Sequence, residues 1–180
     1  MPTALSGVVV VDAVSSADHR GAFSRYYCQR ALAAVIGDRH IVQINHSRTV
    51  KAGAVRGLHF QFSPHAEVKM VRCVAGHVLD VAVDLRAGSP TFLQWHAQEL
   101  TPDNAKMLVI PEGCAHGFQA LTAESELLYL HTSYYAPEAE GGFRFDDSRL
   151  AIAWPLPVTE LSERDQRLSA LPPDFRGIAV

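Results

Sequence analysis

Short apolar runs separated by turn-forming residues are the feature that most limits what this chain can fold into. The runs cover residues 7–14, 41–47, 55–62, 67–74, 77–85, 92–100, 106–110 and 126–132. Segments such as KAG, RAGSP, TPDN and PEGCAHG favour turns between the runs. Many short strands at this spacing are typical of a sandwich or barrel, so the sequence predicts an all-β fold of the jelly-roll kind.

Helical patterns are confined to two stretches, residues 24–37 and 161–171. The first ends at Gly37, where a glycine is expected to close a helix. The chain has 180 residues and shows no repeat, low-complexity tract or linker. We therefore expect a single domain over residues 1–180, with a few short peripheral helices.

Composition argues against nucleic acid and membranes as partners and indicates the cellular compartment. A net charge of −3 provides no electrostatic reason to bind nucleic acid or an anionic membrane. The apolar run at the N-terminus stops at Asp12, too early for a signal peptide or a membrane span. The chain has 3 cysteines, and their spacing matches no zinc motif. Reduced thiols in a cytoplasmic protein are the simplest interpretation.

Alternation along the strands gathers polar side chains on particular faces. His59 and Gln61 share one face of their run, Asp80 shares a face with Asp84, and Tyr129 lies in phase with His131. A barrel with a polar interior would produce this pattern, and such an interior is usually a site.

His59 has more than one interpretation from the residues alone. A histidine on a strand face is commonly a hydrogen-bonded structural residue. A metal site of the cupin type would combine an H-x-H pair with P-x-G-x-x-H, and Pro111, Gly113 and His116 match the second pattern. Gln61 replaces the second histidine of the first pair and is a poor ligand, so we expect no catalytic metal. A Cys114 nucleophile with His116 as its base is a third possibility.

A set of segments together defines a family resemblance. They are RGLHFQ (56–61), the stretch E-x-K-M-V-R-C-V-A-G-H-V-L-D-V-A-V-D-L-R-A-G-S-P-T-F (67–92), IPEGCAHGF (110–118), YYAPEAEGGFRFDDSRLAIAWP (134–155) and LSERD (161–165). In this order they resemble the dTDP-4-dehydrorhamnose 3,5-epimerase family, over most of the chain from about Val10 to Asp165. The resemblance implies a cupin-like jelly roll without metal or other cofactor, usually a homodimer, that epimerises a nucleotide-linked 4-keto-6-deoxy sugar in deoxysugar biosynthesis.

The resemblance also implies roles for individual residues. The catalytic base falls on His59, its aspartate partner on Asp165 and the proton donor on Tyr129. The substrate-contacting positions are Arg20, Gln43, Asn45, Arg56, Lys69, His116, Tyr135, Glu140 and Arg164. Tyr135 is the aromatic residue that would stack on the nucleotide base. Two positions depart from the thymidine-linked pattern, because Arg25 replaces a glutamate and Arg164 replaces a lysine. The first reverses a charge, so the nucleotide and the sugar stay open.

Epimerisation beside a ketone explains why these residue types are needed. A neutral imidazole can take a carbon-bound proton near pH 7, and a carboxylate on its other nitrogen fixes the tautomer. A cation such as Lys69, or a donor such as His116, would stabilise the enolate oxygen. Arginine forks suit a diphosphate, and Arg20, Arg56 and Arg164 are the candidates.

Four points are left open by the sequence alone. Arg56 has the wrong parity to share the face of His59, so a bulge at Gly57 is needed. The SERD segment is also a helix-capping pattern for Ser162 and Asp165. Inversion at C3, at C5 or at both would use the same base. A metal-dependent cupin oxygenase and a sugar-binding cupin without catalysis are the alternative functions.

Overall fold

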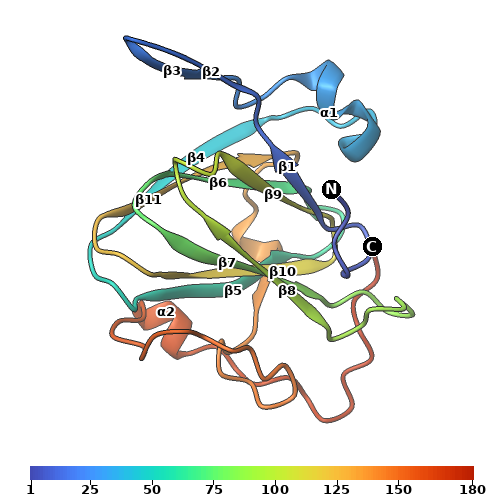
Figure 1. Cartoon of the computed structure of the whole chain (residues 1–180). Helices are drawn as coiled ribbons and strands as arrows, with labels where there is room; N and C mark the ends of the chain where they lie inside the picture. Colours follow the sequence, from blue (N-terminus) through green and yellow to red (C-terminus); the bar gives the residue numbers. More distant parts are fainter.

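Two five-stranded antiparallel sheets face each other in the computed structural model, which describes residues 1–180 (Figure 1). The first sheet has the order β1 (Val9–Asp12), β9 (Lys106–Ile110), β6 (Lys69–Ala75), β11 (Ser125–His131) and β4 (Gln43–Thr49). The second has the order β12 (Glu140–Gly142), β5 (Val55–Gln61), β10 (Cys114–Ala120), β7 (Val78–Asp84) and β8 (Trp95–Leu100). The all-β jelly-roll prediction is confirmed.

Three apolar clusters hold the layers together. Leu108, Phe118 and Leu127 belong to the cluster between the two sheets. The outer face of the first sheet is covered by α1 (Gln29–Ile36), whose Leu32 and Ile36 are buried against it. The outer face of the second sheet is covered by the C-terminal segment, which is drawn in orange and red in Figure 1. Each sheet is therefore covered on both faces, and this leaves the pair rigid enough to position side chains between them.

All the predicted strands are present, with shifted ends, but one segment was assigned wrongly. PEGCAHG was interpreted as a turn, whereas only its first part turns and β10 begins at Cys114. Gly113, at φ +78°, makes the turn. The strands β2 (Ser15–Asp18), β3 (Gly21–Ser24) and β12 were not predicted.

The helices are shorter than predicted, and α2 (Glu163–Gln166) is a single turn. A short 3-10 turn, Pro137–Ala139, precedes β12. Gly37 closes α1 as expected, because it has φ +61° and its N–H bonds to the carbonyl of Ala33.

A bulge occurs in β5 at the place where the sequence requires one. On β10, His116 pairs with His59 and Phe118 pairs with Arg56, so two steps on β10 match three on β5. The extra step turns both Arg56 and His59 toward the same pocket. Gly57 has φ +116°, and a Cβ there would lie 2.6 Å from the Cα of Gly117. Only glycine therefore fits this position of RGLH.

The hairpin of β2 and β3 projects away from the sandwich, as the blue arm in Figure 1 shows. Its Phe23 side chain is 75% exposed, and Val14 just before it is 85% exposed. None of the helices has both the length and the apolar character needed to cross a membrane.

Candidate active site

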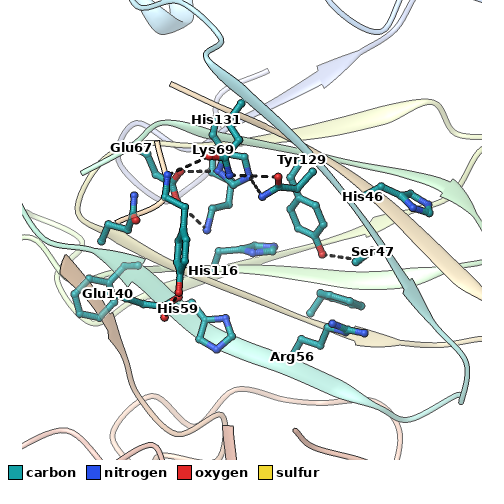
Figure 2. Close-up of a pocket in the computed structure, with 16 residues that line it drawn as sticks. His46, Ser47, Arg56, His59, Glu67, Lys69, His116, Tyr129, His131 and Glu140 are labelled. Atoms are coloured by element: carbon teal, nitrogen blue, oxygen red, sulfur yellow. Dashed lines mark hydrogen bonds and ion pairs between the residues drawn. The ribbon is translucent and has the colours of Figure 1, made fainter. Parts of the chain in front are cut away.

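A pocket of about 290 Å³ opens between the two sheets, and strands of both sheets line it. Most of its lining is polar, in contrast to the apolar cluster that fills the rest of the interior. The lining residues are Gln43, Asn45, His46, Ser47, Arg56, His59, Phe60, Gln61, Glu67, Lys69, His116, Phe118, Tyr129, His131, Tyr135 and Glu140 (Figure 2). Nine of the residues that the sequence predicts for the site are in this set.

His59 is paired with a buried carboxylate. Its Nε2 lies 2.6 Å from Oδ1 of Asp165, and the backbone N–H of Gly57 donates to the other carboxylate oxygen at 3.4 Å. Burial alone would raise the pKa of Asp165, but the His59 contact, the Gly57 N–H and the Ser162 side chain outweigh it and hold this pKa below its usual value. An ionised Asp165 accepts the Nε2 proton, which leaves the lone pair of His59 on Nδ1.

Asp165 satisfies both interpretations of the SERD segment. Its backbone N–H donates to Oγ of Ser162 at 3.0 Å and caps α2, while its side chain contacts His59. The cap fixes the first turn of α2, and that turn aims the carboxylate at the second sheet. The helix-capping and His-partner interpretations are therefore compatible.

Tyr129 faces His59 from the opposite sheet, because it lies on β11 whereas His59 lies on β5 (Figure 2). Its hydroxyl lies 3.0 Å from Oγ of Ser47. Burial raises the pKa of Tyr129 well above its usual value, and the Ser47 bond offsets only part of that rise. The phenol consequently keeps its proton at neutral pH, as a proton donor must.

Lys69 and His116 are each held by a carboxylate. Nζ of Lys69 lies 3.2 Å from Glu67, and Nε2 of His116 lies 2.7 Å from Oδ1 of Asp80. Burial lowers the pKa of His116, and the charge of Asp80 only partly opposes this. A neutral His116 gives its ring N–H to Asp80, so Lys69 is the better donor for an enolate.

The mouth of the pocket has one cation without a carboxylate partner, and hydrogen bonds and an ion pair link the side chains of its rim. Arg56 donates to Thr49 and to the carbonyl of Arg48, and it has no carboxylate partner. Glu140 joins the hydroxyl of Tyr135, at 3.1 Å, to the guanidinium of Arg164, at 2.6 Å. Further along the rim, Gln43 contacts Asn45 and the backbone N–H of Tyr135, and Figure 2 shows Arg56 and Glu140 on opposite sides.

Arg20 is the predicted site residue that this chain does not bring to the pocket or its rim. It lies between β2 and β3, is exposed, and pairs with Asp18 at 2.6 Å. Arg25, which follows β3, lies in a depression beside α1 rather than in the pocket. Their expected contacts with substrate stay predictions.

The predicted set omitted several pocket or supporting residues, among them Ser47, Glu67, Asp80 and His131. The alternation pattern already placed Asp80 on a polar face and His131 in phase with Tyr129. Glu67 is two residues before Lys69, which is the spacing of side chains on one face of an extended segment. These signals give the face but not the partner, because Ser47, Asp80 and His131 each bond to a residue that is far away in the sequence.

The alternative interpretations of the histidines fit the geometry less well. Nowhere do three or more His, Cys, Asp or Glu side chains gather in a way that could hold a metal ion. The Gln61 amide is used by the protein, since it donates to the carbonyls of His65 and Tyr134 and accepts from the N–H of Ala136. Burial raises the pKa of the Cys114 thiol to about 12, so this group is not a thiolate nucleophile at neutral pH.

Comparison with known proteins gives one consistent result. Residues 2–172 match the family model described as dTDP-4-dehydrorhamnose 3,5-epimerase. The chain is 43% identical over 165 residues to the dTDP-4-dehydrorhamnose 3,5-epimerase of Salmonella typhimurium, covering 91% of this chain and 90% of that protein. It is 40% identical to the dTDP-4-dehydrorhamnose 3-epimerase of Streptomyces niveus, covering 92% and 80%.

A solved structure gives the same result for the fold. The dTDP-4-dehydrorhamnose 3,5-epimerase of Bacillus anthracis, with TDP and PPi bound, superposes with a TM-score of 0.91 at 36% identity. The match covers 95% of this chain and 98% of that one. The cupin-like form of the jelly roll is thereby confirmed.

Proposed function

Because the chain belongs to the dTDP-4-dehydrorhamnose 3,5-epimerase family, we propose that it inverts carbon centres beside the ketone of a nucleotide-linked 4-keto-6-deoxy sugar. One arrangement carries the proposal. His59 lies on one sheet and is paired with Asp165, and Tyr129 lies on the opposite sheet. A base and an acid on two faces of one pocket are what inversion at carbon requires.

The proposed reaction begins with proton abstraction. Nδ1 of His59 takes the proton from the carbon next to the ketone, and Asp165 stabilises the imidazolium that forms. The electron pair of the broken C–H bond moves onto the ketone oxygen, where the ammonium of Lys69 stabilises the enolate. Lys69 is 13% exposed, so its field acts with little screening by water.

The reaction ends with a proton delivered to the other face of the carbon. Tyr129 donates its phenolic proton to the enolate carbon, the ketone reforms, and the centre is inverted. Solvent then returns a proton to Tyr129 and removes one from His59, so no net proton is consumed. No metal or redox cofactor takes part in the proposed cycle.

The substrate would enter with its diphosphate at the mouth of the pocket. Arg56 is a cation without a carboxylate partner at this mouth, and Arg164 lies on the rim beside Glu140. A fork of N–H donors suits phosphate oxygens. Tyr135 is 51% exposed and presents a ring on which a nucleotide base can stack. We propose dTDP as the first nucleotide carrier to test. The pathway that we propose for the chain is deoxysugar and cell-surface polysaccharide biosynthesis.

The proposed working unit is a homodimer of one cupin-like domain, in the cytoplasm. The exposed Phe23 and Val14 give the β2–β3 arm an apolar surface, and edge strand β4 exposes 60% of Ile44. Association would cover these groups. Arg20 on the arm would then contact substrate in the partner's pocket. Free Cys28, Cys73 and Cys114 are compatible with a reducing compartment.

Incubation with a panel of 4-keto-6-deoxy sugar nucleotides in deuterated water tests the function. The panel combines dTDP, UDP, CDP and GDP carriers, and NMR measures deuterium at C3 and at C5. We expect wash-in and inversion with at least one dTDP-linked sugar, and the labelled carbons identify the regiochemistry. If no sugar of the panel exchanges a proton, the proposed function is wrong.

A further inference from the structure

Glu67 lines the pocket and takes no part in the proton transfers proposed above. Its carboxylate has two separate partners, since one oxygen lies 3.2 Å from Nζ of Lys69 and the other lies 2.6 Å from Nδ1 of His131. All three side chains are nearly buried, with exposed fractions of 10%, 13% and 9% in that order. Figure 2 shows the three grouped together above His116.

The charge of Glu67 is fixed by its partners. Burial alone would raise the pKa of Glu67, but the bond from His131 and the charge of Lys69 outweigh it, so this pKa lies below its usual value. An ionised carboxylate between an ammonium and an imidazole N–H can only accept hydrogen bonds. Glu67 therefore holds the Lys69 ammonium on one side and the His131 ring on the other.

The same carboxylate sets the direction of a hydrogen-bond chain along the pocket wall. With Nδ1–H of His131 given to Glu67, its Nε2 accepts from the amide of Asn45 at 3.3 Å. The oxygen of Asn45 then accepts from Gln43 at 3.2 Å, and the oxygen of Gln43 accepts from the backbone N–H of Tyr135 at 3.1 Å. Every donor in the chain points toward Glu67, so one charge orients two amides that line the pocket.

We propose that Glu67 is a positioning residue for the epimerisation, which holds the Lys69 ammonium at the ketone oxygen and, through His131, orients Asn45 and Gln43 toward the sugar. The proposal rests on the proposed function. It assigns His131 a structural task at the site, because both of its ring nitrogens are already occupied by Glu67 and Asn45.

A double-mutant cycle between Glu67 and Lys69 separates positioning from simple stabilisation. The chains compared are the wild type, Glu67→Gln, Lys69→Met and the double variant, each measured for kcat and for deuterium exchange. Lys69→Met should lower kcat by about 10²- to 10³-fold, as loss of an enolate-stabilising donor does. Glu67→Gln should lower it by about 10²-fold, because the cation is displaced. Most of the Glu67→Gln loss should disappear in the double variant, which should be no more than about tenfold slower than Lys69→Met, because only the orientation of Asn45 and Gln43 is then left to lose.

Independent losses that multiply in the double variant would overturn the proposal, as would a wild-type kcat in Glu67→Gln. If Glu67→Gln does not fold, Glu67→Asp keeps the charge, and most of its smaller loss should again disappear in the Lys69→Met background. Glu99→Gln is the matched control, since Glu99 pairs with His77 at 2.9 Å outside the pocket and should leave kcat unchanged.

A readout without turnover distinguishes failure of this proposal from failure of the function. Nitrogen-15 NMR of the His131 ring in the wild-type protein should show the proton on Nδ1 and a bare Nε2. A proton on Nε2 instead would overturn the positioning role of Glu67, whether or not the chain epimerises a sugar. A wild-type chain that epimerises no sugar, yet has the Nδ1–H tautomer, would contradict the function alone.

Discussion

Nε2 of His59 lies 2.6 Å from Oδ1 of Asp165, although 106 residues separate the two in the chain. The contact joins the middle of β5 to the single turn of α2, which is the last helix of the protein. His59, the proposed base, is thereby given its tautomer by a carboxylate whose position is fixed by the capped turn of α2. The catalytic consequence of this pair can be tested without touching the base itself.

Asp165→Asn should lower kcat by about 10²- to 10⁴-fold with little change in unfolding free energy, because an amide gives no charge to the imidazolium and can present the wrong hydrogen-bonding group. Steady-state kinetics and urea unfolding measure the two effects. Ser162→Ala is the matched control, since it removes the cap of α2 but keeps the carboxylate. It should cost about 1 kcal/mol of stability and change kcat only a few-fold. Equal kcat losses in both variants would mean that Asp165 acts only through the helix.

Asp84 should make the fold sensitive to acid. Burial opposes its ionisation, but bonds from Arg86, Ser89 and Thr91 outweigh this and lower the pKa of Asp84 to about 2. A carboxyl with a depressed pKa in the folded state stabilises above its unfolded pKa, about 3.9, and loses that contribution as pH falls toward about 2. Relative to Asp84→Asn, the wild type should gain about 2 to 3 kcal/mol at pH 6, and the difference should close by about pH 2.

Urea unfolding at several pH values measures this difference. Asp103→Asn, which alters an exposed aspartate in a turn, is the control and should show no such pH-dependent gap. A gap for Asp84→Asn that stays constant from pH 6 to pH 2 would contradict the assignment.

Chelation should leave the activity intact. His59 and His116 each have a carboxylate partner, and the Gln61 amide is bonded by backbone groups, so these side chains are not free to bind metal together. Enzyme treated with chelator and then desalted should keep its kcat. A loss that stoichiometric iron or zinc restores would show that the pocket works as a metal site.

Mixed dimers should test the arm. If Arg20 contacts substrate in the partner's pocket, chains with His59→Ala and chains with Arg20→Ala should complement each other after mixing and refolding. About half of randomly paired dimers are mixed and each has one intact site, so about a quarter of full activity should return. A mixture of His59→Ala and Asp165→Asn should return none, because His59 and Asp165 of one chain belong to the same pocket and each pocket of a mixed dimer therefore keeps one of the two changes. Absence of recovery in the first mixture, with mixed dimers present, would place Arg20 outside the site.

The sequence predicts the central part of the fold because alternation and turns are local signals. The strands carrying His59, Lys69 and Tyr129 were all predicted from apolar runs. β10 was missed because Pro111 and Gly113 begin its segment and its buried residues, including Gly117 and Ala115, do not alternate with exposed ones. The helix predicted over 161–171 was too long, because α2 ends at Gln166 and Leu171 beyond it packs in the apolar cluster of the second sheet outside any helix.

Contacts between residues that are far apart in the sequence explain what the sequence did not predict at the site. The Glu67–His131 bond spans 64 residues, and no local pattern pairs the two. Simple alternation along the strand puts Arg56 on the face opposite His59. The extra residue in β5 brings both side chains to the same pocket. Roles for His59, Tyr129 and Asp165 came from family resemblance, because each also has an ordinary structural explanation.

Proton exchange measured with inversion in the same sample tests the central claim most directly. The wild type, His59→Ala and Tyr129→Phe are incubated with the substrate in deuterated buffer, and NMR follows the sugar protons. His59→Ala should lose both exchange and inversion by roughly 10²- to 10⁴-fold. Tyr129→Phe should still exchange, with retained configuration, while the inverted product falls sharply. Full exchange in His59→Ala, or wild-type inversion in Tyr129→Phe, would contradict the assignment of base and acid to the two sheets.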